Sequence, residues 1–136
     1  TTLTDDNIAN YLQSFTGHNN FSAGFQTGTD KNYWLNGTGT TNVLASALVQ
    51  GDVLCLAIDL DNDKIWGRVN GGAWSDAGDP ATNTNGRGFG STDLDASGVG
   101  LAFATFDKTS VYDQATLNTG ASGFAFTAPS GFSAWN

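Results

Sequence analysis

The most regular pattern of apolar and polar residues runs through the middle of the chain. Residues 53–60 are apolar on both alternating faces, which predicts a central strand buried on two sides. The polar residues 61–64 predict a turn, and residues 65–71 then alternate as a second strand does. The pattern therefore predicts an antiparallel hairpin. Its second strand carries Ile65 and Val69 on one face and Trp66, Arg68 and Asn70 on the other.

A different spacing, with apolar residues three and four positions apart, occurs near the N-terminus. It predicts one short helix over residues 4–16, with Thr4 as its cap and Gly17 directly after its end. About three turns of helix are marginal in isolation, so this helix is expected to pack against a sheet. Its apolar stripe consists of Ile8, Tyr11, Leu12 and Phe15.

The rest of the chain alternates short apolar stretches with turn residues. Asn36-Gly37 is a hairpin-turn signal, because Asn and Gly tolerate positive φ. Residues 73–89 contain Gly, Asp, Pro and Asn throughout, which predicts a surface loop. The other predicted elements are irregular strands over 20–33, a strand or turn over 43–49, strands over 98–106 and 122–128, and a turn over 129–132.

The composition favours strands over helices. The chain of 136 residues has no Glu and no Met, and only five Lys and Arg, so strong helix formers are scarce. Four Trp, three Tyr and nine Phe are too many for a disordered chain. These features predict an all-β fold in a single domain, residues 1–136. Cys55 is the one cysteine, so no internal disulfide can form.

The charge excludes some classes of partner. All thirteen acidic residues are Asp, and the formal net charge is −8. Such a surface repels phosphate backbones and acidic leaflets, so nucleic acid and anionic membranes are disfavoured as partners. No apolar run approaches the roughly 18 residues that a membrane span needs. Thr1 stands where a start methionine would, which indicates a processed or excised chain.

The predicted hairpin and its flanks resemble the signature of the SPRY domain family. Gly51-Asp52-Val53, Asp59-Leu60-Asp61, Lys64-Ile65-Trp66 and Val69-Asn70-Gly71 follow that family's pattern in order and spacing. The resemblance is more specific for the SPRY-like modules of bacteriophage virion proteins and of phage-like bacterial proteins. The segments that make it so are residues 72–74, 78–81 and 126–132. The resemblance covers roughly residues 20–136.

This resemblance implies a bent antiparallel two-sheet sandwich of the concanavalin-like type. It also implies a binding or structural module whose loops, at one end of the sandwich, contact the partner. The aromatic-rich segment with which the family opens has no match here, so the first strands of a full domain are expected to be missing. A neighbouring chain could supply them at an open sheet edge.

Metal and catalytic signals are weak. Asp59, Asp61 and Asp63 resemble the start of a calcium loop, but the glycine and the closing acid of such a loop are absent. We therefore expect no cofactor, with weak calcium binding as an alternative there or in the loops. His18 is the one candidate general base, and Cys55 lies within the predicted buried strand. Without a motif for catalysis, the chain is not expected to be an enzyme.

Recognition of a ligand through loops is better supported. Aromatic faces commonly hold sugar rings, and loops commonly carry binding residues. Trp66 and Trp135 are interpreted as packing residues, and Lys31, Arg68 and Arg87 as solvated charges. The candidate ligand-binding residues are Tyr33, Trp34, Asn36, Trp74, Asp76, Asp79 and Asn83.

Two functional hypotheses follow. The first is a non-catalytic recognition module of a phage or bacterial surface appendage, which binds a host-surface glycan or protein. The second is a structural subunit of an extracellular assembly, such as a capsid decoration, fibre or filament, which contacts neighbouring subunits. Both place the chain outside the cell or on a virion surface. Asn20 and Asn36 fit the glycosylation acceptor pattern, which matters only in a eukaryotic source.

Overall fold

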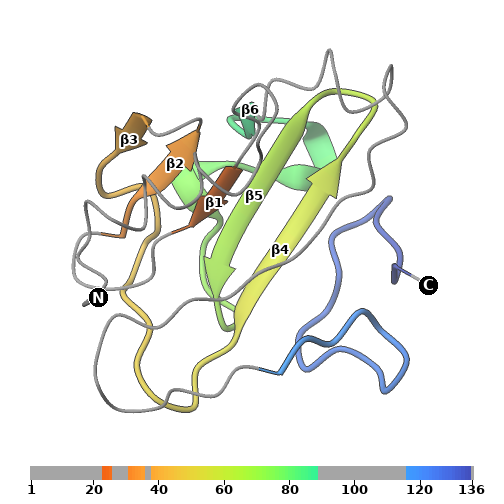
Figure 1. Ribbon diagram of the computed structural model, residues 1–136. Coiled ribbons are helices and arrows are strands. Elements are labelled where there is room, and N and C mark those ends of the chain that lie inside the picture. Colours follow the sequence, from red (N-terminus) through yellow and green to blue (C-terminus); the bar gives the residue numbers. More distant parts are fainter. Residues whose placement is uncertain (1–22, 26–30, 36–37, 89–115, 136) are drawn as a thin grey trace, which may run out of the picture.

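The computed structural model describes residues 23–25, 31–35, 38–88 and 116–135 (Figure 1). The helix predicted over residues 4–16 and the strand predicted over 98–106 lie outside the described residues. The same holds for the candidates His18, Asn20 and Asn36.

The described part is rich in strands, and its helices are two 3₁₀ turns of three residues each. Two three-stranded antiparallel sheets form, in the orders β1-β2-β3 and β4-β5-β6. This confirms the predicted strand-rich character. The elements are β1 (Ala23–Phe25), β2 (Tyr33–Leu35), β3 (Thr38–Thr40), β4 (Leu54–Asp59), β5 (Lys64–Val69), η1 (Ser75–Ala77), η2 (Pro80–Thr82) and β6 (Arg87–Gly88).

Both predicted hairpins are confirmed by strand register. Leu35 pairs with Thr38, so β2 and β3 are joined across positions 36 and 37. β4 and β5 pair from Leu54 opposite Val69 to Asp59 opposite Lys64. An apolar run, a polar turn and period-2 alternation in the second strand were sufficient signals for this second hairpin because all three act locally.

The prediction that the first strand of this hairpin is buried on two sides is wrong. Leu56 is 38% exposed, and Val53 and Leu60 at its ends are 39% and 57% exposed. Within the described sheet, β4 is an edge strand that pairs with β5 alone. An apolar run thus marks a strand here, but its length does not indicate how many layers cover it.

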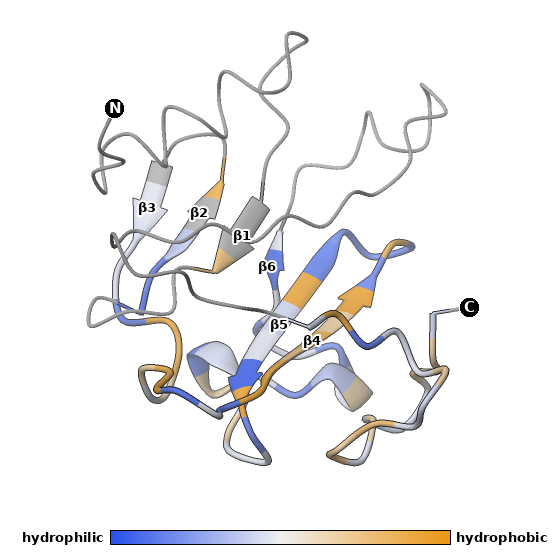
Figure 2. Ribbon diagram, turned by 60° about the horizontal axis from the view of Figure 1, so that its bottom comes forward, coloured by the Kyte–Doolittle hydropathy of each residue, from blue (hydrophilic) through white to orange (hydrophobic). Residues whose placement is uncertain are grey.

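The core joins residues from both sheets with the segment after β3. Tyr33, Val43, Leu44 and Ile65 form its buried cluster. In Figure 2, the orange colour of hydrophobic residues appears both in the segment after β3 and in β4. The half-buried residues Phe25, Leu35, Leu54 and Ile58 pack against the cluster.

Close approach in this core depends on a glycine. A Cβ on Gly67 would lie 2.9 Å from the Phe25 ring and 3.1 Å from the Leu44 side chain. The Phe25 and Tyr33 rings are tilted at 57° with their centroids 5.2 Å apart. A side chain at position 67 would therefore force the Phe25 ring and the Leu44 side chain away from the β5 backbone.

Two segments are irregular: residues 43–49, predicted as a strand or turn, and residues 122–128, predicted as a strand. Residues 43–49 form no strand, and Val43 and Leu44 enter the core on backbone bonds to the Lys31 carbonyl, at 2.9 and 3.3 Å. Residues 122–128 are also not a strand, and Phe124 is 45% exposed. Within the described residues, the alternating apolar residues of this second segment pair with no other strand. The turn predicted over residues 129–132 is confirmed by a bond from the Phe132 N–H to the Pro129 carbonyl.

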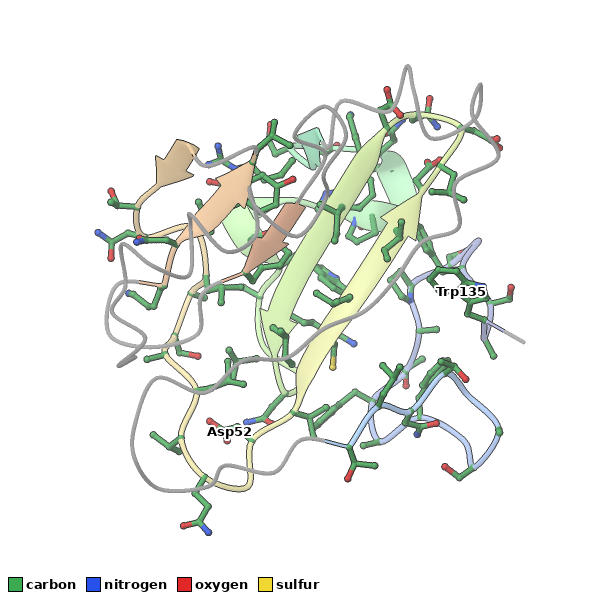
Figure 3. All side chains as sticks on the ribbon, viewed as in Figure 1. Asp52 and Trp135 are labelled. Atoms are coloured by element: carbon green, nitrogen blue, oxygen red, sulfur yellow. The ribbon has the colours of Figure 1, made fainter. Side chains whose placement is uncertain are left out.

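The C-terminal segment, residues 116–135, runs on the side of β4 away from the β1-β2-β3 sheet (Figures 1 and 2). It contacts β5 through its side chains and carbonyls. The Phe132 ring meets the Trp66 ring edge-on at 6.1 Å, and Arg68 Nη2 donates to the Thr127 carbonyl at 2.8 Å. Trp135 stays 46% exposed near the end of this segment (Figure 3), so it is only partly a packing residue.

The open end of the β4–β5 hairpin is closed by Asp52 and Asn70. Asp52 lies where the chain enters β4 (Figure 3), and Asn70 follows β5. Asn70 Nδ2 donates to Asp52 Oδ1 at 2.8 Å, and Asn70 Oδ1 accepts the Val53 N–H at 2.9 Å. Asp52 Oδ2 also accepts the Val49 N–H at 2.9 Å. These bonds connect the residues that precede β4 with the residue that follows β5.

Replacing Asp52 with Asn is expected to lower the thermal midpoint at neutral pH, by an amount that shrinks in acid. The side chain of Asn70 and the N–H of Val49 hold the pKa of Asp52 below its usual value. The carboxylate therefore stabilises the fold above its unfolded-state pKa of about 4, and this contribution disappears as the pH falls through the folded pKa. Thermal unfolding followed by circular dichroism at about pH 7 and about pH 3 measures the effect.

Asp61→Asn is the matched control, because Asp61 is an exposed residue of the hairpin turn. It removes the same charge without removing the contacts to Asn70 and Val49. A difference between the unsubstituted protein and Asp52→Asn that stays constant across both pH values would contradict this role for Asp52.

Candidate functional site

The β5–β6 loop, residues 70–86, covers Trp66. The sequence predicted a surface loop over 73–89, but the segment contains η1, η2 and β6, and its Ser75 is fully buried. Trp66 has no exposed surface, and its Nε1 donates to the Thr84 carbonyl at 2.8 Å. The Ser75 hydroxyl accepts the Gly67 N–H at 3.2 Å. This segment is therefore part of the folded core as well as of the surface.

Two glycines let the loop lie against the indole. A Cβ on Gly78 would lie 2.8 Å from Trp66 Cδ1, and one on Gly86 would lie 2.6 Å from Cε2 and Cζ2. Neither position has room for a side chain unless the ring moves. Lys64 adds a further tie, because its Nζ donates to the Asn83 carbonyl at 2.7 Å. The path of the loop is thus set by β5 side chains.

A bidentate ion pair connects the loop to β6. Arg87 Nε and Nη2 donate to the two carboxylate oxygens of Asp76, each at 2.5 Å. This hydrogen bonding raises the pKa of Arg87. Asp76 itself has φ +55°, and its N–H donates to the Val43 carbonyl at 3.1 Å. The parallel pairing of guanidinium and carboxylate fixes both side chains more firmly than a single contact would.

An open depression of about 410 Å³ lies at this ion pair. It is lined by Asp76, Asn85, Gly86 and Arg87. The Asp76 and Arg87 side chains are 26% and 29% exposed, so both can be reached from solvent. The depression therefore offers a carboxylate, a guanidinium and an amide side chain within one small surface.

Two other predicted loop residues, Asp79 and Asn83, lie at the two ends of η2. Asp79 caps η2, with Oδ1 accepting the Ala81 N–H at 3.0 Å and Oδ2 accepting the Thr82 hydroxyl at 3.1 Å. Asn83 ends η2 with φ +58°, and its Oδ1 is buried without a hydrogen-bond partner among the described residues. Asp79 is thus engaged in shaping the loop that carries the depression.

Trp74 is half-buried and carries a cation on one ring face. The Arg68 guanidinium lies 4.3 Å from the ring centroid of Trp74. Arg68 also bonds the Thr127 carbonyl, so Trp74 stands next to the contact between β5 and the C-terminal segment. A sugar ring could stack on Trp74 only from the opposite face.

Tyr33 does not present a ring face to a ligand. It is 3% exposed in the core, and its hydroxyl donates to the Gly88 carbonyl at 2.8 Å. Burial raises the pKa of this hydroxyl far above its ordinary value. Trp34 lies in β2 opposite Gly24 and Gly39, and its side chain lies outside the described residues.

The structure thus brings four of the predicted residues, Trp74, Asp76, Asp79 and Asn83, onto one loop. Sequence reasoning missed Asn85, Gly86 and Arg87 as site residues. Arg87 was interpreted as a solvated charge, but it is paired with Asp76. A lone arginine at the end of an aspartate-containing loop was the signal that could have identified the pair.

No group of three or more His, Cys, Asp or Glu side chains that could hold a metal occurs in the described part of the chain. The carboxylates of Asp59, Asp61 and Asp63, which were the alternative calcium site, therefore do not form such a group. Asp59 instead accepts the Asn62 N–H and side-chain amide, at 3.0 and 2.8 Å, which lowers its pKa. Cys55 is half-buried, and its thiol donates to the Asn70 carbonyl at 3.4 Å.

Among the residues that the structure describes, no helix has the length and apolar character to cross a membrane. Comparison with known proteins gives no match for this chain among family models, curated proteins or solved structures.

Proposed function

We propose that this chain is a non-catalytic recognition module that binds a host-surface glycan or protein through the β5–β6 loop. The observation that carries the proposal is the depression at Asp76, Asn85 and Arg87 on a loop fixed by Trp66. A loop that is already ordered loses little conformational entropy when a ligand binds. Polar groups held on a rigid support are typical of recognition sites.

On the basis of the resemblance to SPRY-like modules, the proposal includes a phage or bacterial surface appendage as the setting, outside the cell or on a virion. It also suggests a two-sheet sandwich whose loops contact the partner. One described feature agrees with the two-sheet arrangement, because residues of both sheets share one core.

The proposal is tested by replacing Asn85 with Gly. Asn85 is exposed, lines the depression and has φ +51°, which glycine adopts without strain. Binding to a glycan array and to a panel of whole bacterial cells is expected to weaken roughly tenfold, because one or two hydrogen bonds are lost.

Asn42→Gly is the matched control. Asn42 is also exposed and has φ +57°, but it lies outside the β5–β6 loop. Its replacement should leave binding unchanged. If the unsubstituted chain binds none of the glycans or cells, or if both variants bind as it does, recognition through this loop is contradicted.

A structural subunit of an extracellular assembly is the second candidate. It is favoured by large apolar side chains on the described surface, which a neighbouring subunit would cover. Size-exclusion chromatography with light scattering tests it, since a chain that stays strictly monomeric at high concentration contradicts this role. The exposed apolar side chains that favour this candidate are 45% to 70% exposed, and they belong to Val49, Leu60, Leu117, Phe124 and Trp135.

A further inference from the structure

The geometry of the depression points to a neutral polyhydroxylated ligand, a sugar residue that presents two adjacent hydroxyl groups. This inference rests on the proposed function and adds the chemical class of the ligand. It starts from the four lining residues, which are Asp76, Asn85, Gly86 and Arg87.

The net charge of the lining is the first argument. The Asp76 carboxylate and the Arg87 guanidinium neutralise each other at 2.5 Å. An anionic ligand would have to approach Arg87 next to that carboxylate, on a chain whose formal net charge is −8. A cationic ligand would meet the guanidinium. A neutral ligand meets neither repulsion, so the pair favours a molecule without formal charge.

The second argument is the set of hydrogen-bonding groups that the ion pair leaves over. Arg87 uses one N–H of Nε and one of Nη2 on Asp76. A guanidinium has five N–H groups, so those of Nη1 and the second of Nη2 remain for a ligand. Each Asp76 oxygen accepts one of these bonds and retains a second lone pair. The site therefore offers donors and acceptors side by side.

A hydroxyl group matches this arrangement because it donates and accepts at the same time. Two adjacent hydroxyls could bond the guanidinium with one oxygen and the carboxylate with the other. The Asn85 amide adds one more donor and acceptor at the rim. A carboxylate or sulfate group only accepts hydrogen bonds, so it would supply no donor to the remaining lone pairs of Asp76.

The lining also indicates how strong the binding is. All four residues are polar or glycine, so a sugar gains hydrogen bonds here but no aromatic stacking. A site of this kind binds a single sugar weakly, and firm attachment to a surface requires several copies acting together.

The experiment compares binding of the full chain to arrayed neutral glycans and to arrayed sialylated or uronate-containing glycans, at about 0.05 M and about 0.5 M salt. The chain is presented multivalently on a scaffold. Neutral glycans are expected to bind, with less than a twofold change between the two salt concentrations. Asn85→Gly is expected to weaken this binding roughly tenfold, and Asn42→Gly to leave it unchanged.

Each other outcome overturns the inference in a recognisable way. Binding of acidic glycans that weakens with salt and requires Asn85 would contradict the neutral ligand class but leave the proposed function intact. Binding of bacterial cells that requires Asn85, without binding of any glycan, would indicate a protein ligand. Glycan binding that Asn85→Gly does not change, or no binding to glycans or cells, would contradict the site and the proposed function together.

Discussion

Replacing Trp66 with Ala is expected to destabilise the protein by about 3–5 kcal/mol, a large part of the roughly 5–15 kcal/mol by which domains are stable. Trp66 has no exposed surface. Its removal leaves a cavity between β5 and the β5–β6 loop, and the Thr84 carbonyl loses one of its two donors, the other being the Asp79 N–H. Equilibrium unfolding in urea, followed by far-UV circular dichroism, measures the loss.

Trp135→Ala is the control for this substitution. Trp135 is 46% exposed, so the same change of side chain there should cost about 1 kcal/mol or less. If Trp66→Ala unfolded within about 1 kcal/mol of the unsubstituted chain, the position of Trp66 at the centre of the fold would be contradicted.

The second large effect is expected for Leu44→Ala, at about 2–5 kcal/mol. Leu44 is 1% exposed and belongs to the cluster that joins the two sheets. Its Cδ2 atom lies against β5 at Gly67, which has no side chain to fill the space that Leu44 would leave. The same urea unfolding measurement applies.

Leu117→Ala provides the comparison, because Leu117 is 64% exposed and should change stability by about 0.5 kcal/mol or less. Equal destabilisation by the two leucine substitutions would mean that the segment after β3 does not connect the sheets. Leu44 would then be no more important than a surface residue.

The hairpins could be predicted from the sequence because their signals are local. Side chains of residues 65–69 alternate between the two faces of β5, so Ile65 and Trp66 lie on opposite faces. The burial of each face depends on segments far away in the chain. The pattern at Val43 and Leu44 predicts a strand or turn. In the structure these residues form no strand pair, and their N–H groups donate to the Lys31 carbonyl.

The candidate site could be predicted only in part, for the same reason. Polar loop residues identified Asp76, but not its partner Arg87 eleven positions later. The burial of Tyr33 depends on Phe25 and on a carbonyl 55 residues away, at Gly88. Such tertiary contacts leave no mark in the local pattern of either segment.

The β5–β6 loop is held to the folded core and carries the site proposed for recognition. Trp66 and Lys64 of β5 donate hydrogen bonds to carbonyls of this loop, and Arg87 forms an ion pair with Asp76 at the surface of the loop. Close packing at Gly78 and Gly86 means that the loop has one well-defined path. Under the proposed function, residues 74–87 are a preformed binding surface supported by a structural core.

The most direct test of this claim is a titration followed by two-dimensional ¹H–¹⁵N NMR, using the neutral glycan with the strongest array signal. The account predicts that shift changes concentrate on Asp76, Asn85, Gly86 and Arg87, including the Arg87 Nε–H that bonds Asp76. Shift changes confined to the C-terminal segment, residues 116–135, or a β5–β6 loop that does not respond at saturating glycan, would contradict it.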